Sequence, residues 1–309
     1  MSGGVALTFH ERYLGRGFVP RRSSWSRYRL GLRSFEDAGL FRGGLRVYRH
    51  VAAGDEELAA VHTPRYLARL REMDELGRGM VDDRQTPAYR GMFSRAAIAV
   101  GGSVLAARLV AEGRVRHAFN PGGGLHHAHA DHASGFCLLN DVAVMARHLE
   151  ERFGVTRMAI LDVDAHHGDG TQALLSDRVL VVSLHEFGAR FFPGTGPSED
   201  RGAGLAVNLP LARGDGDAVV LERFARAEER IRRFAPELLV LLFGTDGHAN
   251  DPFSHLTMSD AGFAAITSRA HALAHESCDG RLVVLGGGGY EPVTVARLWT
   301  SMLLELLSS

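Results

Sequence analysis

Acidic and histidine side chains follow an apolar run near the middle of the chain, in the sequence DVDAHHGDG at residues 162–170. The run that leads into them, Met158–Asp162, has the pattern of a strand buried on both faces of a parallel sheet. Burying charged groups there is costly unless they pair or bind a metal ion. Asp164 and His166 are two positions apart, so on an extended strand end they point to the same side. This spacing predicts a pair of metal ligands.

A third candidate ligand, Asp246, lies in GTDGHANDP (244–252), which follows another apolar run. Three nitrogen and oxygen ligands with one open position are the pattern of a catalytic zinc site. Fe(II) or Mn(II) would accept the same ligands, so the residue types alone do not select the metal. For Asp164 alone, a buried hydrogen-bonded network is the better interpretation. The three residues together favour a metal.

Apolar runs alternate with helical patterns along most of the chain, which predicts an α/β fold with a parallel sheet covered by helices on both faces. The predicted strands are Val5–Phe9, Ala118–Asn120, Met158–Asp162, Val179–Leu184, Leu205–Leu209, Leu238–Phe243 and Leu282–Leu285. The predicted helices are Ser94–Glu112, Asn140–Phe153, Ala218–Phe234, Ser259–Glu276 and Val293–Leu307. Active sites of such sheets lie at the carboxyl ends of the strands. Five of these ends carry His, Asp, Tyr, Phe or Gly, so we expect them to meet in one site.

Composition limits the classes of partner. The 309 residues carry a net charge of −1, which gives no indication of nucleic acid or an acidic membrane surface as a partner. We find no apolar run of about 18 residues and no secretory signal, so we expect no membrane span. Two cysteines, Cys137 and Cys278, cannot build a disulfide framework, which favours a cytoplasmic location.

Five separated motifs together resemble the zinc-dependent histone deacetylase superfamily. They are HHAHADHASGFC (126–137), DVDAHHGDG (162–170), SLHEFGARFFPGTG (183–196), GTDGHANDP (244–252) and LGGGGYEPVTVARLW (285–299). The stretch NPGGGLHHA (120–128) is similar to the bacterial acetoin-utilisation branch. The resemblance extends from near His10 to Trp299. It implies one catalytic domain over residues 1–309 with the arginase–deacetylase fold, an α/β fold whose parallel sheet has about eight strands.

The resemblance also implies roles for individual residues. Asp164, His166 and Asp246 would hold zinc, and Tyr290 would bind the oxyanion. Proton transfer would fall to the tandem pair, His126 held by Asp162 and His127 held by Asp169. The remaining implied positions are Gly135, Phe136, Phe192 and Gly288 for substrate, and Asp162, Asp164, His166, Ser183 and Leu184 for a structural potassium ion. Arg21 or Arg22 could line a channel for acetate exit.

The chemistry of these residues fits amide hydrolysis, which needs an activated water, a polarised carbonyl and a proton for the leaving amine. Zinc supplies the first two functions, and histidine exchanges protons near neutral pH. We therefore expect His127 to act as general base and acid. The expected substrate is an acetylated lysine of a protein or a small acetylated amine, including an acetylated polyamine. The oligomeric state is left open.

Two other classes of function compete with this hypothesis. A ureohydrolase of the same fold uses two manganese ions and further aspartates, but this sequence has Gly168 and His248 at those positions. A catalytically inactive acyl-lysine-binding module would lack a metal ligand or the tyrosine, and both are present. Within the enzyme hypothesis, the acidic segment Glu72–Pro87 is expected to be a loop, and it could gate the entrance for a polyamine.

Overall fold

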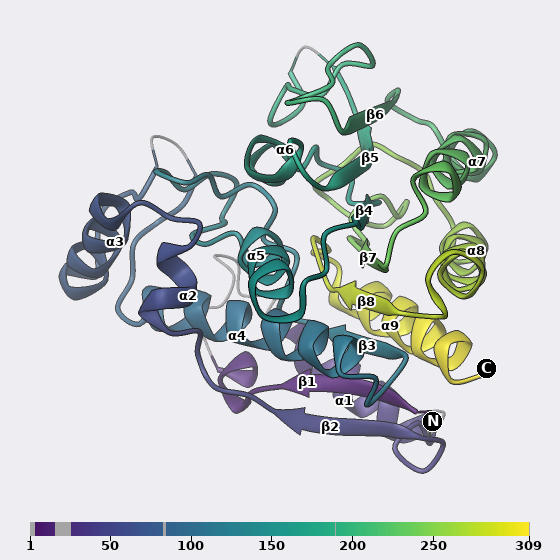
Figure 1. Ribbon diagram of the computed structural model, residues 1–309, viewed down its shortest axis with the longest axis horizontal. Coiled ribbons are helices and arrows are strands. Elements are labelled where there is room, and N and C mark those ends of the chain that lie inside the picture. Colours follow the sequence, from purple (N-terminus) through teal and green to yellow (C-terminus); the bar gives the residue numbers. More distant parts are fainter. Residues whose placement is uncertain (1–3, 16–25, 83–84, 189, 309) are drawn as a thin grey trace.

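The computed structural model describes residues 4–15, 26–82, 85–188 and 190–308; the predicted channel residues Arg21 and Arg22 lie outside them. The described strands form one eight-stranded, all-parallel sheet in the order β2-β1-β3-β8-β7-β4-β5-β6 (Figure 1). The strands are β1 Val5–Phe9, β2 Leu45–Arg49, β3 His117–Asn120, β4 Met158–Asp162, β5 Leu180–Glu186, β6 Ala206–Leu211, β7 Leu238–Leu242 and β8 Leu282–Leu285. The predicted fold class and the expected number of strands are confirmed.

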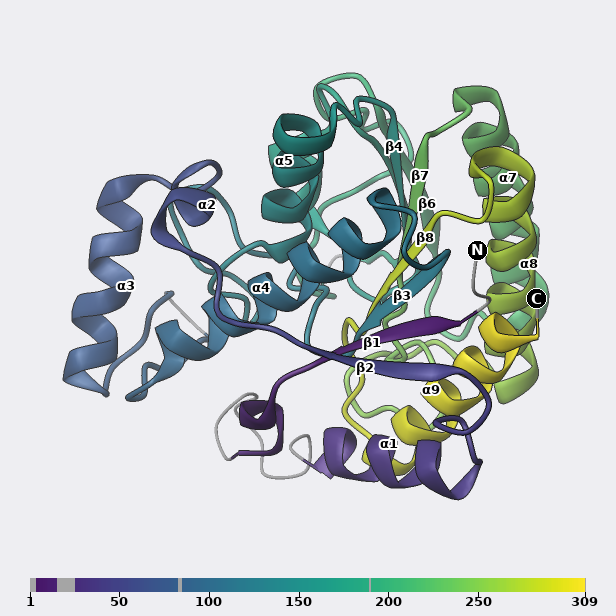
Figure 2. The same cartoon turned by 60° about the horizontal axis from the view of Figure 1, so that its bottom comes forward.

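Helices cover both faces of this sheet (Figure 2). Their bounds are α1 Ser26–Asp37, α2 Asp55–Ala59, α3 Pro64–Leu76, α4 Met92–Ala111, α5 Asp141–Phe153, α6 Asp169–Leu175, α7 Asp217–Phe234, α8 Asp260–Cys278 and α9 Pro292–Leu307, with a 3-10 turn at Glu11–Leu14. One apolar core joins α1, α7, α8 and α9 to the sheet, and a second joins α4 and α5 to the opposite face. Helices α2 and α3 extend this second side outward and share a third cluster with α4.

Several elements were not predicted from the sequence. Strand β2 is an edge strand whose five residues are mostly exposed, so LRVYR lacks the apolar run that marks the central strands. Helices α1, α2, α3 and α6 were also missed, and α6 begins inside the motif DVDAHHGDG. The segment Glu72–Pro87, expected to be a loop, begins in the last turns of α3. Three of the missed elements, β2, α2 and α6, have only five to seven residues, too few for a clear periodicity of apolar residues. Helices α1 and α3 are longer, and their buried faces were overlooked.

Helix α4 passes between the sheet and the outer helices and is the most apolar of the long helices. Among the described helices it alone is long and apolar enough, by length and composition, to cross a membrane. In its most apolar stretch 67% of the residues are buried inside the fold. A buried core helix has these same properties, so the feature is weak evidence for a membrane span.

Candidate active site

Asp164, His166 and Asp246 meet at the carboxyl ends of β4 and β7. Their side chains offer ligand atoms that all lie within 4.8 Å of one another. His166 Nδ1 lies 2.9 Å from Asp246 Oδ2 and 3.3 Å from Asp164 Oδ1. Strands β4 and β7 are direct neighbours in the sheet, which explains why residues about 80 positions apart in the chain converge. The predicted group of candidate ligands is therefore brought together, and it can hold a metal ion.

The surroundings of this group favour a positive charge. Burial lowers the pKa of His166, but its hydrogen bonds with the two carboxylates outweigh burial and raise that pKa to about 10. Burial and the neighbouring Asp164 charge raise the pKa of Asp246. Two buried carboxylates facing one imidazole are the donor set that a divalent cation would neutralise. The residues present thus fit the metal that the sequence predicted.

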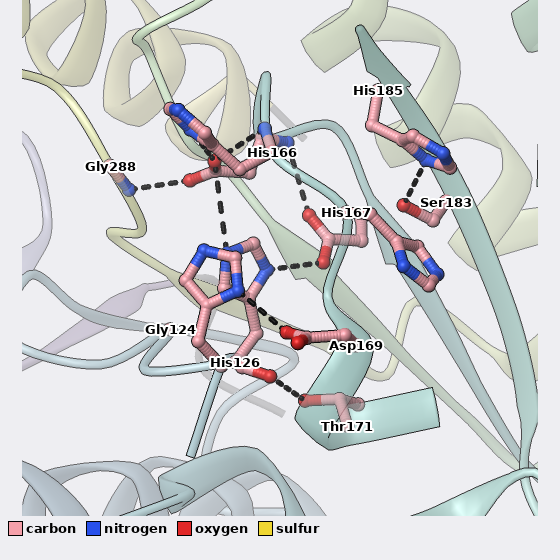
Figure 3. A network of polar contacts seen from close by, with 12 residues as sticks. Gly124, His126, His166, His167, Asp169, Thr171, Ser183, His185 and Gly288 are labelled. Carbon is pink, nitrogen blue, oxygen red and sulfur yellow. Dashed lines mark hydrogen bonds and ion pairs between the residues drawn. The ribbon is translucent and has the colours of Figure 1, made fainter. Parts of the chain in front are cut away.

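Backbone amides fix the two carboxylates from behind. Gly288 N–H donates to Asp164 Oδ2 at 2.7 Å (Figure 3), and Ala165 N–H donates to Asp246 Oδ1 at 2.9 Å. A Cβ on Gly288 would lie 2.7 Å from Asp164 Oδ2 and 2.8 Å from Asp246 Cγ, closer than real side chains come. Glycine at this position lets the loop after β8 approach both carboxylates.

The tandem histidines lie beside this group, and each has the carboxylate partner that was expected. His126 Nδ1 is 2.7 Å from Asp162 Oδ2, and His127 Nδ1 is 2.8 Å from Asp169 Oδ1. Their Nε2 atoms face each other at 3.1 Å. Each carboxylate accepts a hydrogen bond from the Nδ1–H of its partner, which leaves Nε2 of both rings directed into the site.

The two rings differ in their affinity for protons. Burial lowers the pKa of His126, but the Asp162 and Asp164 charges outweigh it and raise that pKa to about 9. Burial and the positive charge on His126 lower the pKa of His127 to about 4. At neutral pH His126 is therefore charged, whereas His127 is neutral and able to accept a proton.

The loop that carries the tandem histidines is anchored to the start of α5. Asn140 caps this helix by accepting from Ala143 N–H at 2.9 Å, and its Nδ2 donates to the Ala128 carbonyl at 2.9 Å. The buried Asp141 carboxylate accepts from the amides of Gly124 at 3.0 Å and Leu125 at 2.6 Å. One helix terminus thereby holds both sides of the segment that contains His126 and His127.

Tyr290 reaches the site from the Gly-rich loop after β8. Its backbone N–H donates to Asp251 Oδ2 at 2.6 Å, and its ring lies 4.2 Å from that of Phe253. Burial raises the pKa of the Tyr290 hydroxyl well above its ordinary value, so the group stays protonated and can donate a hydrogen bond. Asp251, which fixes this loop, was not singled out from the sequence. Its position in the motif GTDGHANDP was the available signal.

Phenylalanine rings line the cavity that leads to the candidate site. A cavity of about 490 Å³ opens above the site and is lined by Phe136, Phe192, Phe253 and Tyr290 among others. The Phe192 ring contacts the His127 ring edge-on, with centroids 4.9 Å apart. Gly135 has a positive φ of 53°, and a Cβ there would lie 2.8 Å from both His127 Cγ and Phe192 Cε1. The four positions predicted for substrate therefore line one continuous region, with Gly288 on its inner side.

A second cavity of about 60 Å³ lies on the inner side of the same residues. It is lined by His126, His127, Asp164, Tyr290 and also Arg27. The buried Arg27 guanidinium donates to the carbonyls of Gly287 and Gly289, each at 3.1 Å. Arg27 was not singled out from the sequence, because its neighbours in the chain give no motif.

The residues predicted for potassium lie at adjacent strand ends. Asp162 of β4 is in register with Ser183 of β5, and Leu184 follows. Ser183 Oγ lies 2.9 Å from His185 Nδ1 (Figure 3). The structure thus brings these positions together and leaves their role as a prediction.

Comparisons with known proteins agree with this geometry. The model of the histone deacetylase domain matches residues 22–306. The chain is 36% identical over 272 residues to the acetoin utilization protein AcuC of Bacillus subtilis, covering 81% of this chain and 69% of that protein. It is 36% identical over 302 residues to a probable deacetylase of Archaeoglobus fulgidus, covering 93% and 81%.

A solved structure has the same architecture. The crystal structure of the HDA15 HD domain superimposes with a TM-score of 0.89 at 28% identity, covering 99% of this chain and 90% of that one. The fold and the site are those of a deacetylase-type α/β protein. The chain belongs to the histone deacetylase family, and the expected resemblance is confirmed.

Proposed function

We propose that this protein is a zinc-dependent amidohydrolase that removes acetyl or other acyl groups from lysine side chains. One observation carries the proposal. Asp164 and His166 line the same cavity as the tandem histidines and Tyr290, and Asp246 completes the candidate metal group beside them. A metal site, a proton acceptor and a hydroxyl donor are the three parts that amide hydrolysis needs.

Asp164, His166 and Asp246 would hold the metal ion. When bound there, zinc would lower the pKa of a water molecule and polarise the acyl carbonyl. Two carboxylates and one imidazole also suit Fe(II), and elemental analysis of the purified protein would distinguish the two ions.

His127 would move the protons. Its neutral ring can accept a proton from the attacking water, and the Asp169 carboxylate at Nδ1 stabilises the charge that then forms. The same ring can pass that proton to the leaving amine. His126, already charged and held by Asp162, would raise the acidity of the protonated His127 and so help this second transfer.

Tyr290 would donate a hydrogen bond to the oxygen of the acyl carbonyl as negative charge develops there. The hydroxyl remains protonated because burial raises its pKa. Asp251 holds the backbone of Tyr290, which fixes the ring at the cavity. Phe136 and Phe192 would enclose the methylene chain of the substrate.

The entrance favours an acyl-lysine over an acetylated polyamine. Among the described residues that line the 490 Å³ cavity, none is acidic, and Arg190 and His255 are present. A polyamine keeps further ammonium groups after acetylation and would meet a cation there. Asp82, in the acidic segment thought to gate a polyamine, accepts from the amides of Gln85 and Thr86 and is thereby tied into a local turn.

The other two classes of function have less support. Gly168 leaves no room for the aspartate of a two-manganese ureohydrolase, because a Cβ there would lie 2.7 Å from Asp162 Oδ2. His248 pairs with Asp260 at 3.0 Å instead of joining the metal group. An inactive binding module is not favoured, since the ligand set and Tyr290 are complete.

The test compares hydrolysis of acetyl-lysine peptides with that of N-acetylated polyamines by the same protein, with its metal content measured and with a hydroxamate chelator as inhibitor. Hydroxamate-sensitive turnover of the peptides, with polyamines inert, is the expected result. A preference for polyamines would show that acetylated polyamines are the substrate class, and it would leave the proposed amide hydrolysis unchanged. Absence of turnover on every acylated amine, with one metal bound at the site, would refute the proposed reaction.

Potassium at Asp162, Asp164, His166, Ser183 and Leu184 is proposed as a structural ion, supported by the paired ends of β4 and β5. The test is exhaustive exchange of the protein into sodium buffer. Metal analysis should then show loss of potassium, and the melting temperature of the protein should fall. A cytoplasmic location is likewise proposed, supported by two free, buried cysteines.

A further inference from the structure

Three histidines gather at the amino ends of the strands, on the edge of the sheet opposite the proposed active site. His117 begins β3, and His271 and His275 are one helical turn apart on α8. His271 Nε2 lies 3.2 Å from His117 Nε2 and 3.1 Å from His275 Nε2. One nitrogen from each ring lies within 4.8 Å of the other two. Three imidazole nitrogens thus converge on a single point.

The spacing of these nitrogens is that of a metal site. A zinc ion binds histidine nitrogen at about 2.0–2.1 Å in tetrahedral geometry, which places neighbouring nitrogens about 3.3 Å apart. The two Nε2 separations of 3.2 and 3.1 Å are close to that edge length. The rings are steeply inclined, by 85° between His117 and His271 and by 70° between His271 and His275, so neither pair is stacked.

Glu305 of α9 sets the tautomer of the central ring. Its Oε1 lies 3.3 Å from His271 Nδ1, and a carboxylate can only accept, so Nδ1 carries the proton. The Nε2 atom of His271 therefore points at the other two rings. A carboxylate behind a histidine in this way is the usual outer partner of a metal-bound imidazole.

Gly280 supports the two remaining rings. Its backbone is a hydrogen-bond partner of His117, and it packs under His275, where a Cβ on Gly280 would come 2.8 Å from Cε1 of that ring. A metal ion at the convergence point would satisfy all three nitrogens.

We propose that His117, His271 and His275 form a second metal site, for a borderline divalent transition ion such as Zn²⁺, Co²⁺ or Ni²⁺. Three imidazole nitrogens favour these ions over Mg²⁺ and Ca²⁺, which prefer oxygen ligands. His275 is partly exposed, so water has access to the fourth position. The ion would tie α8 to β3, a role independent of the deacetylase reaction.

The experiment measures Zn²⁺ bound per chain at equilibrium, in metal-free protein dialysed against buffered Zn²⁺. Wild type is expected to bind two ions. His275→Ala and His271→Ala should each bind one and keep the active-site metal, whereas Asp164→Ala should lose the active-site metal and keep the ion at the histidines. His148→Ala is the matched control, because His148 is a partly buried helical histidine that pairs with Glu57 and belongs to neither group.

A spectroscopic readout identifies the ligands directly. Cu²⁺ bound to Asp164→Ala should show hyperfine coupling to three imidazole nitrogens, and His275→Ala in that background should abolish this signal. Glu305→Gln removes the charge behind His271 and should weaken Zn²⁺ binding about 10–100-fold without changing the number of ions bound at saturation. Circular dichroism would show that each variant is folded.

Wild-type protein that binds a single ion, released by Asp164→Ala and unaffected by His275→Ala, would overturn the proposal. So would a second ion that survives both histidine substitutions, since it would lie elsewhere on the surface. A protein that binds at the histidines yet hydrolyses no acylated amine would refute the proposed function and leave this site standing.

Discussion

Replacing Gly288 with alanine is the sharpest single perturbation of the proposed metal site. The position has no positive φ, so alanine can adopt its backbone conformation. The added methyl group would lie 2.7 Å from Asp164 Oδ2 and 2.8 Å from Asp246 Cγ. Ordinary contacts of this kind are about 3.5 Å, so the Asp164 oxygen must retreat by about 0.8 Å. The Asp246 carboxylate must retreat by at least about 0.7 Å, because its Oδ2 lies closer still.

That displacement is large for a metal site, where ligand distances are kept within about 0.2 Å. The Gly288 N–H that orients Asp164 would move at the same time. Disturbing one orienting contact of a ligand costs about 10–100-fold in affinity, or roughly 1.4–2.8 kcal/mol, and here two ligands are displaced. We therefore expect Gly288→Ala to weaken Zn²⁺ binding by about 100-fold or more, the upper end of that range.

Competition with a chromophoric chelator would measure the Zn²⁺ affinity, with deacetylation of an acetyl-lysine peptide followed in parallel. Activity should be lost at limiting Zn²⁺ and recover in part when Zn²⁺ is in excess. Gly43→Ala is the control, because Gly43 is exposed and its nearest contact would be an ordinary 3.5 Å. A folded Gly288→Ala with wild-type Zn²⁺ affinity would refute the assignment of Asp164 and Asp246 as ligands.

Three further outcomes are expected. Tyr290→Phe should lower kcat about 10²–10³-fold with little change in KM in steady-state assays, because the hydroxyl acts on the transition state; a raised KM with kcat intact would contradict this. Gly135→Ala, which pushes a methyl group against His127, should lower kcat while metal content stays at the wild-type level; loss of metal would contradict that reading. Burial lowers the pKa of His62 to about 4, so the unfolded chain takes up a proton first as pH falls. The free energy of unfolding should therefore fall as the pH is lowered from about 6.5 to 4. In His62→Gln the slope of this free energy against pH, measured by denaturant titration, should be shallower by up to about 1.4 kcal/mol per pH unit. An unchanged slope would show that His62 titrates normally.

Much of the fold could be read from the sequence because its central strands are buried on both faces. Strands β4, β7 and β8 have only buried residues, so each appears as a continuous apolar run. The edge strand β2 is mostly exposed and carries two arginines, so it has no continuous apolar run. Its place in the sheet depends on pairing with β1, a tertiary contact that local sequence does not encode.

The candidate site was predictable to the extent that its residues lie in strand-end motifs. Asp164 and His166 follow from their spacing, whereas the pairing of His127 with Asp169 came from the family resemblance. Arg27 could not be found this way, because it reaches the site by bonding to backbone carbonyls about 260 positions along the chain. The cluster of His117, His271 and His275 could not be found from local sequence either. The spacing of His271 and His275 on α8 is visible in the sequence, but the third ring, His117, comes from strand β3.

The order of the strands also bears on how the chain reaches its final form during synthesis. Strands β1–β3 and β4–β6 emerge first, yet they form two separate ribbons, because β8 and β7 lie between β3 and β4. Neither ribbon has a hydrogen-bonded neighbour on its inner side until the last two strands arrive. Long-range parallel pairing of this kind is slow and leaves strand edges open meanwhile. Asp246 and Tyr290 arrive with those strands, so a nascent chain on the ribosome would be unable to capture the metal early, and protection of the open edges would fall to chaperones.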